Sequence, residues 1–278
     1  MLLTSMSKRL FNDESEPAPK PHPVVEALEC RQLLSAAAPV AALLVPAYFY
    51  PTPGGDWDRM AAAAASGTPV TAILNPDSGP GTSADPVYAA AVNKLRGDGG
   101  HVVGYVHTQN SNGSLRSLKA VEAEVLEYKA FYHLDGIFVD EMMTLSSAVS
   151  YYHNLYAFIK AQNPSYEVIG NPGTNTLETY LTAPAADVLV DFEDNQSSYK
   201  SQVPSSWVEK HASSHFGNIV GKATTVALMD ADLAQARKQN AGFVYVTDQD
   251  IDNDNTAYTR LPTYWSQEVS AVRAEDGL

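Results

Sequence analysis

The sequence has a single cysteine, Cys30, and no run of 18 or more apolar residues among its 278 positions. One cysteine excludes an internal disulfide framework, and the short apolar runs argue against a membrane-spanning helix. Basic residues are also scarce, because 18 Lys and Arg stand against 32 Asp and Glu and give a formal net charge of -14. Nucleic-acid binding requires a basic face, so this composition argues against a nucleic-acid partner, whereas an acidic surface would suit a cationic polymer.

Signatures of several enzyme classes are missing as well. The seven histidines form no His-Glu-x-x-His motif, and no Gly-x-Ser-x-Gly elbow of a serine hydrolase is present. The acidic run 248–254 resembles a calcium loop, but it lacks the glycine and the distant Glu of an EF-hand, and we interpret it as a solvated loop. The sequence therefore predicts no metal and no cofactor, and carboxylate chemistry remains.

The first 39 residues differ from the rest of the chain. They carry four prolines between positions 17 and 23 among charged residues, and they show no helical or strand period, which predicts a disordered or targeting segment. Residues 25–36 resemble the Leu-Glu-x-Arg-x-Leu-Leu-Ser segment found near the start of exported proteins in one bacterial phylum. The resemblance implies a bacterial protein that is secreted or held at the cell surface. We therefore divide the chain into a segment 1–39 and a folded domain 40–278.

From residue 40 onward, short β-rich runs alternate with helical patterns. The predicted strands are Leu43–Tyr50, Val70–Asn75, His101–His107, Leu134–Asp140, Tyr166–Asn171, Val188–Glu193, Ile219–Ala227 and Phe243–Asp248. The predicted helices are Trp57–Ala65, Asp85–Arg96, Ser117–Tyr132, Ala148–Gln162, a short one near Leu177–Leu181, Ser205–His211, Asp230–Gln239 and Arg260–Arg273. Eight βα units in about 240 residues predict a single (β/α)8 barrel of the α/β class. An open doubly wound sheet is the alternative, but no Gly-rich phosphate loop follows the first strand.

The fourth predicted strand ends in two adjacent acids. Residues 134–139 form an apolar run that is typical of a strand buried on both faces, and Asp140 and Glu141 follow it directly. Charged groups at the end of a buried strand must reach water or a ligand. The alternative is that the pair only opens a polar loop and caps the next helix.

Other predicted strands also end in polar or aromatic residues. In (β/α)8 barrels these ends lie on one face and carry the active site. The candidate ligand-binding residues at these ends are Tyr48, Tyr50, Asn75, Tyr105, His107, Asn171 and Asp248, and the sixth strand ends in the acids of Asp191-Phe192-Glu193-Asp194. Aromatic rings, amides and paired acids are what a carbohydrate site requires. Alternatively, the tyrosines pack the barrel top, the histidine is structural, and the two asparagines, each before a proline, form turns.

Four motifs in order resemble the spherulin 4 family, glycoside hydrolase family 135. They are Pro46-Ala47-Tyr48-Phe49-Tyr50-Pro51, Ala72-Ile73-Leu74-Asn75-Pro76, Asp135-Gly136-Ile137-Phe138-Val139-Asp140-Glu141 and Gly170-Asn171-Pro172-Gly173-Thr174. The resemblance extends over about 43–270. It implies a (β/α)8 barrel and endo-hydrolysis of α-1,4-linked N-acetylgalactosamine and galactosamine in secreted or biofilm polysaccharides. The family acids match Asp140, Glu141 and Glu193.

These residues lead to a hypothesis for the mechanism. Asp140 acts as nucleophile or base, Glu193 as general acid, and Glu141 raises the neighbouring proton affinity and holds a hydroxyl or amine of the sugar; the first two roles are interchangeable. A chitinase-like arrangement is disfavoured, because the Asp-Gly-x-Asp-x-Asp-x-Glu pattern would need acids at Phe138 and Met142. Carboxyl groups about 5 to 5.5 Å apart would indicate retention, and groups about 6.5 to 9.5 Å apart inversion.

The same residues allow a second class of function. Rings and amides that position a sugar for cleavage also bind it without cleavage, so a non-catalytic polysaccharide-binding protein of the cell surface or matrix is the alternative. A hydrolase for a different glycan is a third. In each case we expect a polysaccharide ligand and a monomeric protein.

Overall fold

The computed structural model describes residues 42–253 and 256–275, which belong to one unit of the chain, Ala36–Leu278. The predicted targeting segment 1–39 lies outside the described residues. So do Cys30, the export-type stretch 25–36 and the proposed domain boundary at residue 40.

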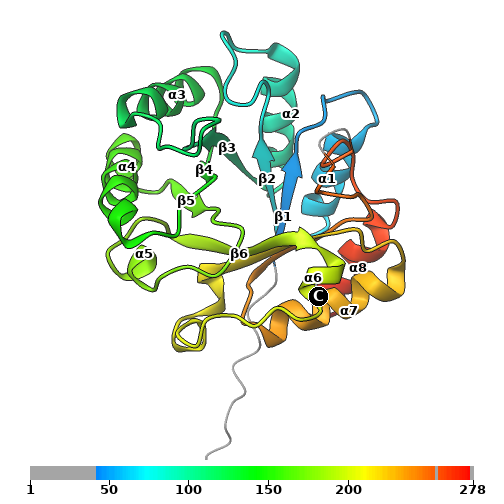
Figure 1. Ribbon diagram of the computed structural model, residues 1–278. Helices are drawn as coiled ribbons and strands as arrows, with labels where there is room; N and C mark the ends of the chain where they lie inside the picture. The colour runs from blue at the N-terminus through cyan, green and yellow to red at the C-terminus, as the bar shows by residue number, and fades with distance from the viewer. Residues whose placement is uncertain (1–41, 254–255, 276–278) are drawn as a thin grey trace, which may run out of the picture. The chain divides into compact units, whose positions relative to one another are not determined.

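Eight parallel strands close into a barrel in sequence order, and β8 pairs with β1 (Figure 1). The strands are β1 (Ala42–Ala47), β2 (Val70–Leu74), β3 (His101–His107), β4 (Gly136–Asp140), β5 (Glu167–Gly170), β6 (Val188–Asn195), β7 (Phe216–Gly221) and β8 (Phe243–Val246). Their residues are mostly apolar and buried because helices cover the outside while side chains fill the interior. The predicted (β/α)8 barrel is confirmed.

Helices follow the strands around the barrel. They are α1 (Asp56–Ala65), α2 (Pro86–Gly97), α3 (Leu118–Phe131), α4 (Val149–Gln162), α5 (Thr179–Thr182), α6 (Gln196–Tyr199), α7 (Val226–Lys238) and α8 (Trp265–Glu275), with 3-10 turns η1 (Ser146–Ala148), η2 (Val208–Lys210) and η3 (Ser213–His215). The predicted start of α2 is confirmed: Pro86 is its first residue, and the Asp85 carboxylate accepts hydrogen bonds from the next two backbone N–H groups.

Three predicted elements were wrong in position. The seventh strand ends at Gly221, and Thr225 caps α7 by accepting from the N–H of Leu228, so 222–225 is a loop and the helix begins at Val226. The predicted helix 205–211 contains only the turn η2, while the short helix α6 was not predicted. The last helix starts at Trp265, since the residues before it form a bonded loop.

Strand pairing is uneven around the barrel. β5 pairs with β6 only at Ile169 and Gly170, whereas β6 pairs with β7 over six positions and shifts register between Val190 and Phe192. This bulge lets β6 run past the end of β5. At the junction of the first and last strands, the described residues form two pairs, Ala42 with Phe243 and Leu43 with Val244.

One carboxyl group is fully buried between α8 and the barrel. Glu268 has 0% of its surface exposed, and its Oε1 accepts a hydrogen bond of 2.8 Å from the N–H of Val246 in β8. Its Oε2 has no hydrogen-bond partner among the described residues. Burial raises the pKa of Glu268 to about 8, so the group is neutral in the folded protein at neutral pH.

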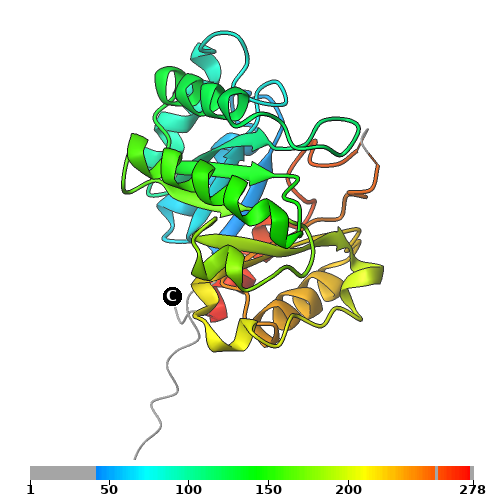
Figure 2. The same ribbon diagram turned by 60° about the vertical axis from the view of Figure 1, so that its left-hand side comes forward.

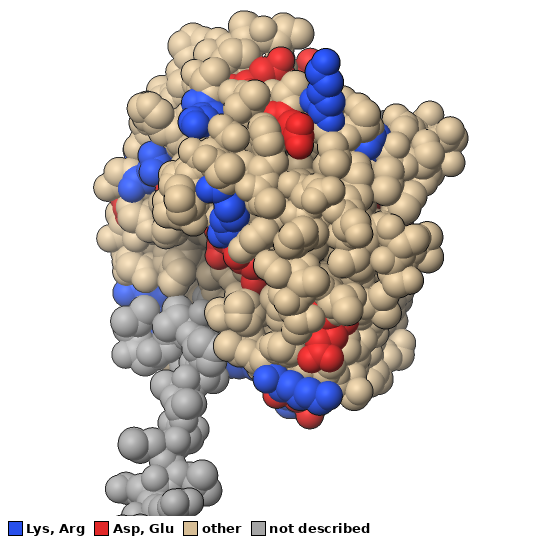
Figure 3. All heavy atoms as spheres, turned by 90° about the vertical axis from the view of Figure 1, so that its left-hand side faces the viewer, with Lys and Arg blue, Asp and Glu red and all other residues tan. Residues whose placement is uncertain are grey.

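Charges of both signs lie on the side of the barrel seen in Figure 3. Lys and Arg alternate there with Asp and Glu over a surface of mainly uncharged residues, so the acidic excess of the chain does not gather on this face. Within 42–253 and 256–275, no helix has both the length and the apolar content needed to cross a bilayer.

Candidate active site

The candidate site lies where β4, β5 and β6 end. Asp140 is the last residue of β4, Asn171 follows the end of β5, and Glu193 lies in the part of β6 that runs past β5. Because all strands are parallel, these ends lie on one face of the barrel, on the side of the arrowheads in Figure 2. Three side chains far apart in sequence are thereby brought together.

A single amide nitrogen joins the two acids. Asn171 Nδ2 donates to Asp140 Oδ1 at 2.7 Å and also to Glu193 Oε2. Each bond is at most a hydrogen-bond length, so these two carboxylate oxygens lie no more than about 6 Å apart. This bound applies to the two oxygens that share the amide, whereas retaining and inverting glycosidases differ in the distance between the whole carboxyl groups.

The turn after β5 fixes the direction of this amide. Asn171 Oδ1 accepts from the N–H of Gly173 at 2.9 Å, which leaves the NH2 group toward the acids. Gly173 has φ of +64°, a conformation that suits glycine, and its carbonyl accepts from the N–H of Glu193 at 3.0 Å. The same turn therefore holds both the bridging amide and the backbone of the second acid.

Only one of the three acids near the end of β6 joins Asp140. Asp191, at the bulge, is buried and accepts from Asn218 Nδ2 at 2.7 Å. Asp194 Oδ1 accepts from the N–H of the next residue. Glu193 alone bonds to Asn171, so the structure brings this residue and neither neighbour to the bridged pair.

Three tyrosines surround the acids. The ring of Tyr48, just after β1, makes edge contacts with Tyr105 of β3 at 5.6 Å and with Tyr258 at 5.4 Å between centroids. Tyr105 lies near enough to Asp140 to lower the pKa of its carboxyl group, and the Tyr258 hydroxyl donates to Glu193 Oε1 at 2.5 Å. The acids therefore sit in a largely aromatic surrounding of low polarity.

This surrounding shifts the titration of both acids. Burial raises the pKa of Asp140, against the hydrogen bonds that favour its charged form. Burial, and next the nearby charge of Asp140, raise the pKa of Glu193 to about 7. Two carboxyl groups this close hold one proton between them near neutral pH, which gives one acid and one carboxylate.

Comparison with known proteins places the chain in a family. The spherulation-specific family 4 pattern matches residues 42–272. The chain belongs to this family. Spherulin-4 of Physarum polycephalum is 37% identical over 242 residues, in a match that covers 84% of this chain and 70% of that protein. The family predicted from the four motifs is thus confirmed.

Solved structures of other proteins share the barrel of this spherulation-specific family member. The catalytic domain of a chitinase from Pyrococcus furiosus matches 87% of this chain and 98% of its own, with a TM-score of 0.50 and 11% identity. A cyclic α-maltosyl-(1→6)-maltose hydrolase from Arthrobacter globiformis matches 87% and 82%, with a TM-score of 0.58 and 9% identity. At such low identity the likeness shows the fold alone.

Glu141 of the family motif has an unusual backbone. Its φ is +55°, and the residue is exposed. The carbonyl of Glu141 accepts from Thr108 Oγ1 at 3.0 Å and from Gln109 Nε2 at 2.6 Å. A non-glycine residue in this region costs on the order of 1 kcal/mol and is held by such bonds, which is a frequent feature of functional sites.

The structure gathers some predicted residues and not others. Tyr48, Tyr105 and Asn171 contact each other or the acids, and the His107 ring lies 6.4 Å from the Tyr105 ring. The structure therefore brings four of the seven predicted ligand-binding residues to the region of the acids.

Tyr50, Asn75 and Asp248 are bonded elsewhere. The Tyr50 hydroxyl donates to the helix-capping Asp85 at 3.1 Å, and Asn75 Oδ1 accepts from the N–H of Gly79 at 2.8 Å, which is the turn-forming role. Asp248 forms an ion pair with Arg260 at 2.9 Å.

Sequence reasoning missed Tyr258 and one histidine pair. Tyr258 lies in the long segment between β8 and α8, which has no period and whose only evident signal is its run of acids. His211 and His215 have His-x-x-x-His spacing, yet one bonds to Glu178 and the other to a backbone carbonyl. Among the described residues no group of three His, Cys, Asp or Glu could hold a metal.

Replacing Asn171 with Ala is expected to lower kcat for glycoside hydrolysis about 100-fold. The bridging amide would be lost, and acids free to move by about 1 Å lose productive alignment. A kcat within twofold of the wild type would contradict this role. Asn163→Ala is the control, because that side chain only accepts from Ser165 beyond the end of α4 and should leave kcat unchanged.

Proposed function

We propose that the protein is a glycoside hydrolase that cleaves α-1,4-linked N-acetylgalactosamine and galactosamine polysaccharide with two carboxylates. The observation that carries the proposal is the Asn171 amide that bridges Asp140 and Glu193 at the C-terminal ends of the strands. The two barrels of comparable fold, a chitinase domain and a cyclic α-maltosyl-(1→6)-maltose hydrolase, add general support for a carbohydrate-active site. The identity of the sugar rests on the family resemblance.

In this mechanism Glu193 starts protonated and Asp140 starts ionised. Glu193 gives its proton to the glycosidic oxygen while an Asp140 oxygen attacks the anomeric carbon, so the glycosidic bond breaks as a glycosyl ester forms. Glu193, now a carboxylate, takes a proton from water, which attacks the ester and releases Asp140. The raised pKa of Glu193, about 7, supports its role as the acid. We propose that the reaction proceeds with net retention of configuration, which the anomer of the first product tests.

The charge around the acids suits an amino sugar. Within the described part of the chain, no salt bridge joins Asp140, Glu141 or Glu193 to Lys or Arg. A free ammonium group on galactosamine would be attracted by these carboxylates. Exposed Glu141 is the acid best placed to meet such a group outside the bridged pair, and Tyr48 offers part of its ring to a sugar face.

The expected setting of the enzyme follows from the first residues. The export-type stretch 25–36 supports a protein that is secreted or held at a bacterial cell surface. There the enzyme would act, as a monomer, on polysaccharide outside the cell.

The test is release of reducing ends from partially deacetylated α-1,4-linked galactosamine polymer. We expect new reducing ends, with the α anomer dominant in early NMR spectra before mutarotation. Tight binding without product would instead favour the non-catalytic polysaccharide-binding function. Product from other glycans in a polysaccharide panel, but not from this polymer, would assign a different substrate.

A further inference from the structure

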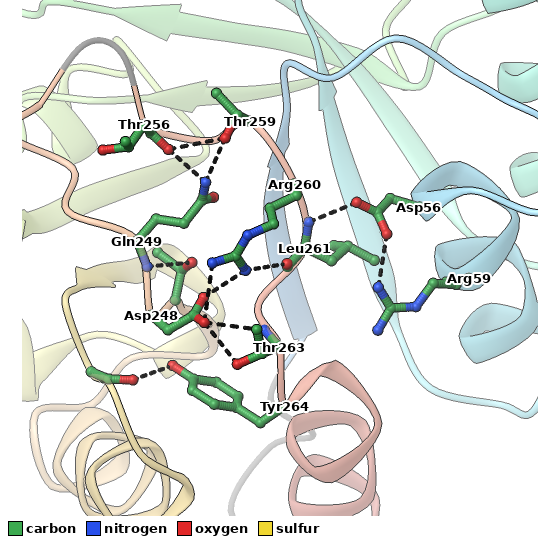
Figure 4. Close-up of polar contacts among 12 residues, drawn as sticks. Asp56, Arg59, Asp248, Gln249, Thr256, Thr259, Arg260, Leu261, Thr263 and Tyr264 are labelled. Carbon is green, nitrogen blue, oxygen red and sulfur yellow. Dashed lines mark hydrogen bonds and ion pairs between the residues drawn. The ribbon is translucent and has the colours of Figure 1, made fainter.

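The segment between β8 and α8 is fastened at its base by one ion pair. The Asp248 carboxylate, just after β8, accepts from Arg260 at 2.9 and 3.2 Å and from Thr263 Oγ1 at 2.7 Å (Figure 4). The side chain of Asp248 is 11% exposed, and these bonds hold its pKa below its usual value despite burial. The two ends of the segment are thus joined through a bidentate charged contact, which is a geometrically specific one.

Two further contacts hold the same segment. Gln249 Nε2 donates to Thr259 Oγ1 at 2.7 Å and to the Thr256 carbonyl at 2.5 Å. The N–H of Leu261 donates to Asp56 Oδ2 at 2.9 Å, which ties the segment to the start of α1 (Figure 4). These bonds lie on both sides of residue 258, so they fix where its side chain points.

These contacts of Asp248, Gln249 and Leu261, which we call the clamp, hold Tyr258 in place. It is 7% exposed, and its φ of +55° is uncommon for a bulky residue, so the surrounding contacts must impose it. Its ring packs edge-on against Tyr48, and its hydroxyl donates to Glu193 Oε1 at 2.5 Å. A side chain 65 positions away in sequence thereby meets the proposed acid.

The two partners of Glu193 differ in what they can do. The Asn171 NH2 group can only donate hydrogen bonds. A proton on Glu193 Oε2 could therefore not form a hydrogen bond to this group. The Tyr258 hydroxyl at Oε1 can donate to a carboxylate or accept from a protonated carboxyl group. When Glu193 is protonated, the Tyr258 hydroxyl can rotate its hydrogen away and accept a hydrogen bond from the carboxyl group. Of the two partners, only Tyr258 can therefore bond to both the charged and the neutral form of Glu193.

We propose that Tyr258 is a positioning residue for Glu193, held by the Asp248–Arg260 ion pair, and that it makes Oε1 the oxygen that carries the acid proton. The catalytic part of this proposal rests on the proposed function. The hydrogen bond between Tyr258 and Glu193 can be tested without measuring turnover. It gives Asp248 a role at the site through Tyr258, instead of the direct substrate contact expected from the sequence.

The electrostatics agree with this arrangement. The titratable groups around Glu193 are Asp140 of β4 and the tyrosines 48, 105 and 258. Burial and the charge of Asp140 raise the pKa of Glu193, whereas the Tyr258 hydrogen bond lowers it by stabilising the charged form. Removing the hydroxyl should therefore raise the pKa of Glu193 further.

The test compares Tyr258→Phe with the wild type. We expect the alkaline limb of the kcat/KM profile to move up by about 1 pH unit and kcat at the optimum to fall about tenfold. Asp248→Asn should shift the limb in the same direction by less, because it loosens the clamp and keeps the hydroxyl. Tyr156→Phe is the matched control. Tyr156 lies on the outer helix α4 and also donates to a carboxylate, that of Asp187 at 2.9 Å, and its replacement should leave the pH profile unchanged.

A second measurement separates this proposal from the proposed function. Infrared difference spectra of the substrate-free protein follow the carboxyl C=O band of Glu193, identified by its loss in Glu193→Gln. We expect its midpoint to rise in Tyr258→Phe, and an unchanged midpoint in a protein whose melting curve is intact would overturn the proposal. If the wild type released no product, the proposed function would fail, and the infrared result would still decide the contact.

Discussion

Glu193→Gln is expected to lower the cleavage rate of the proposed galactosamine polymer substrate about 1000-fold. The amide keeps the shape of the side chain but has no acidic proton for the leaving oxygen, and general acid catalysis contributes roughly this much. Asp140→Asn should cost at least as much, because an amide is a poor nucleophile for forming the glycosyl ester. KM should change little in both variants, since the losses fall on the chemical step.

The control for this prediction is Asp194→Asn. Asp194 is the next residue of β6, and its carboxylate accepts from the backbone N–H beside it and forms no hydrogen bond with Asp140 or Asn171. We expect near wild-type reducing-end release from this variant. If Glu193→Gln kept the turnover of the wild type, Glu193 would not be the general acid. If Asp194→Asn lost turnover instead, Asp194 would become the candidate acid.

Glu268→Gln is expected to raise the free energy of unfolding at pH 8 by on the order of 3 kcal/mol. The pKa of Glu268 rises from 4.5 to about 8 on folding, so the folded protein keeps a proton that the unfolded chain releases. This contribution to stability is complete below about pH 4.5 and is lost as the pH rises toward 8. An amide needs no proton there and keeps the acceptor for the N–H of Val246.

Urea unfolding at pH 5 and pH 8 measures this effect. We expect the wild type to lose stability between the two values, and Glu268→Gln to remove a large part of the loss. Asp191 and Asp232, with pKa values raised by burial to about 7 and 6, act in the same direction. Glu127→Gln, on the exposed side of α3, is the matched control, and an equal gain in both variants would refute the explanation.

The sequence predicted the barrel because its strands are short apolar runs separated by well-marked helix starts. The end of β4 was evident for the same reason, since Asp140 and Glu141 stop an apolar run abruptly. The seventh strand was misplaced because it contains Gly217 and Asn218, while the β-branched residues that follow it belong to a helix cap. In that region the Thr225 cap outweighs β propensity.

The site itself was predictable only as far as strand ends define it. Asp140, Asn171 and Glu193 could be placed on one face by topology, yet the shared amide nitrogen depends on the Gly173 turn. Tyr258 could not be placed at all, because its position depends on hydrogen bonds between segments more than 200 residues apart, such as Leu261 with Asp56. Periodicity contains no information on contacts of that kind.

The junction of β1 and β8 links the closure of the barrel to its chemistry. The described residues there form only two strand pairs, and the bond between Leu261 and Asp56 spans the same junction from the loop that presents Tyr258. If heating parts the first and last βα units before the longer β6–β7 ladder separates, Tyr258 leaves Glu193 while most secondary structure persists. Thermal inactivation would then precede melting, and cross-linking those two units would extend the working life of the enzyme.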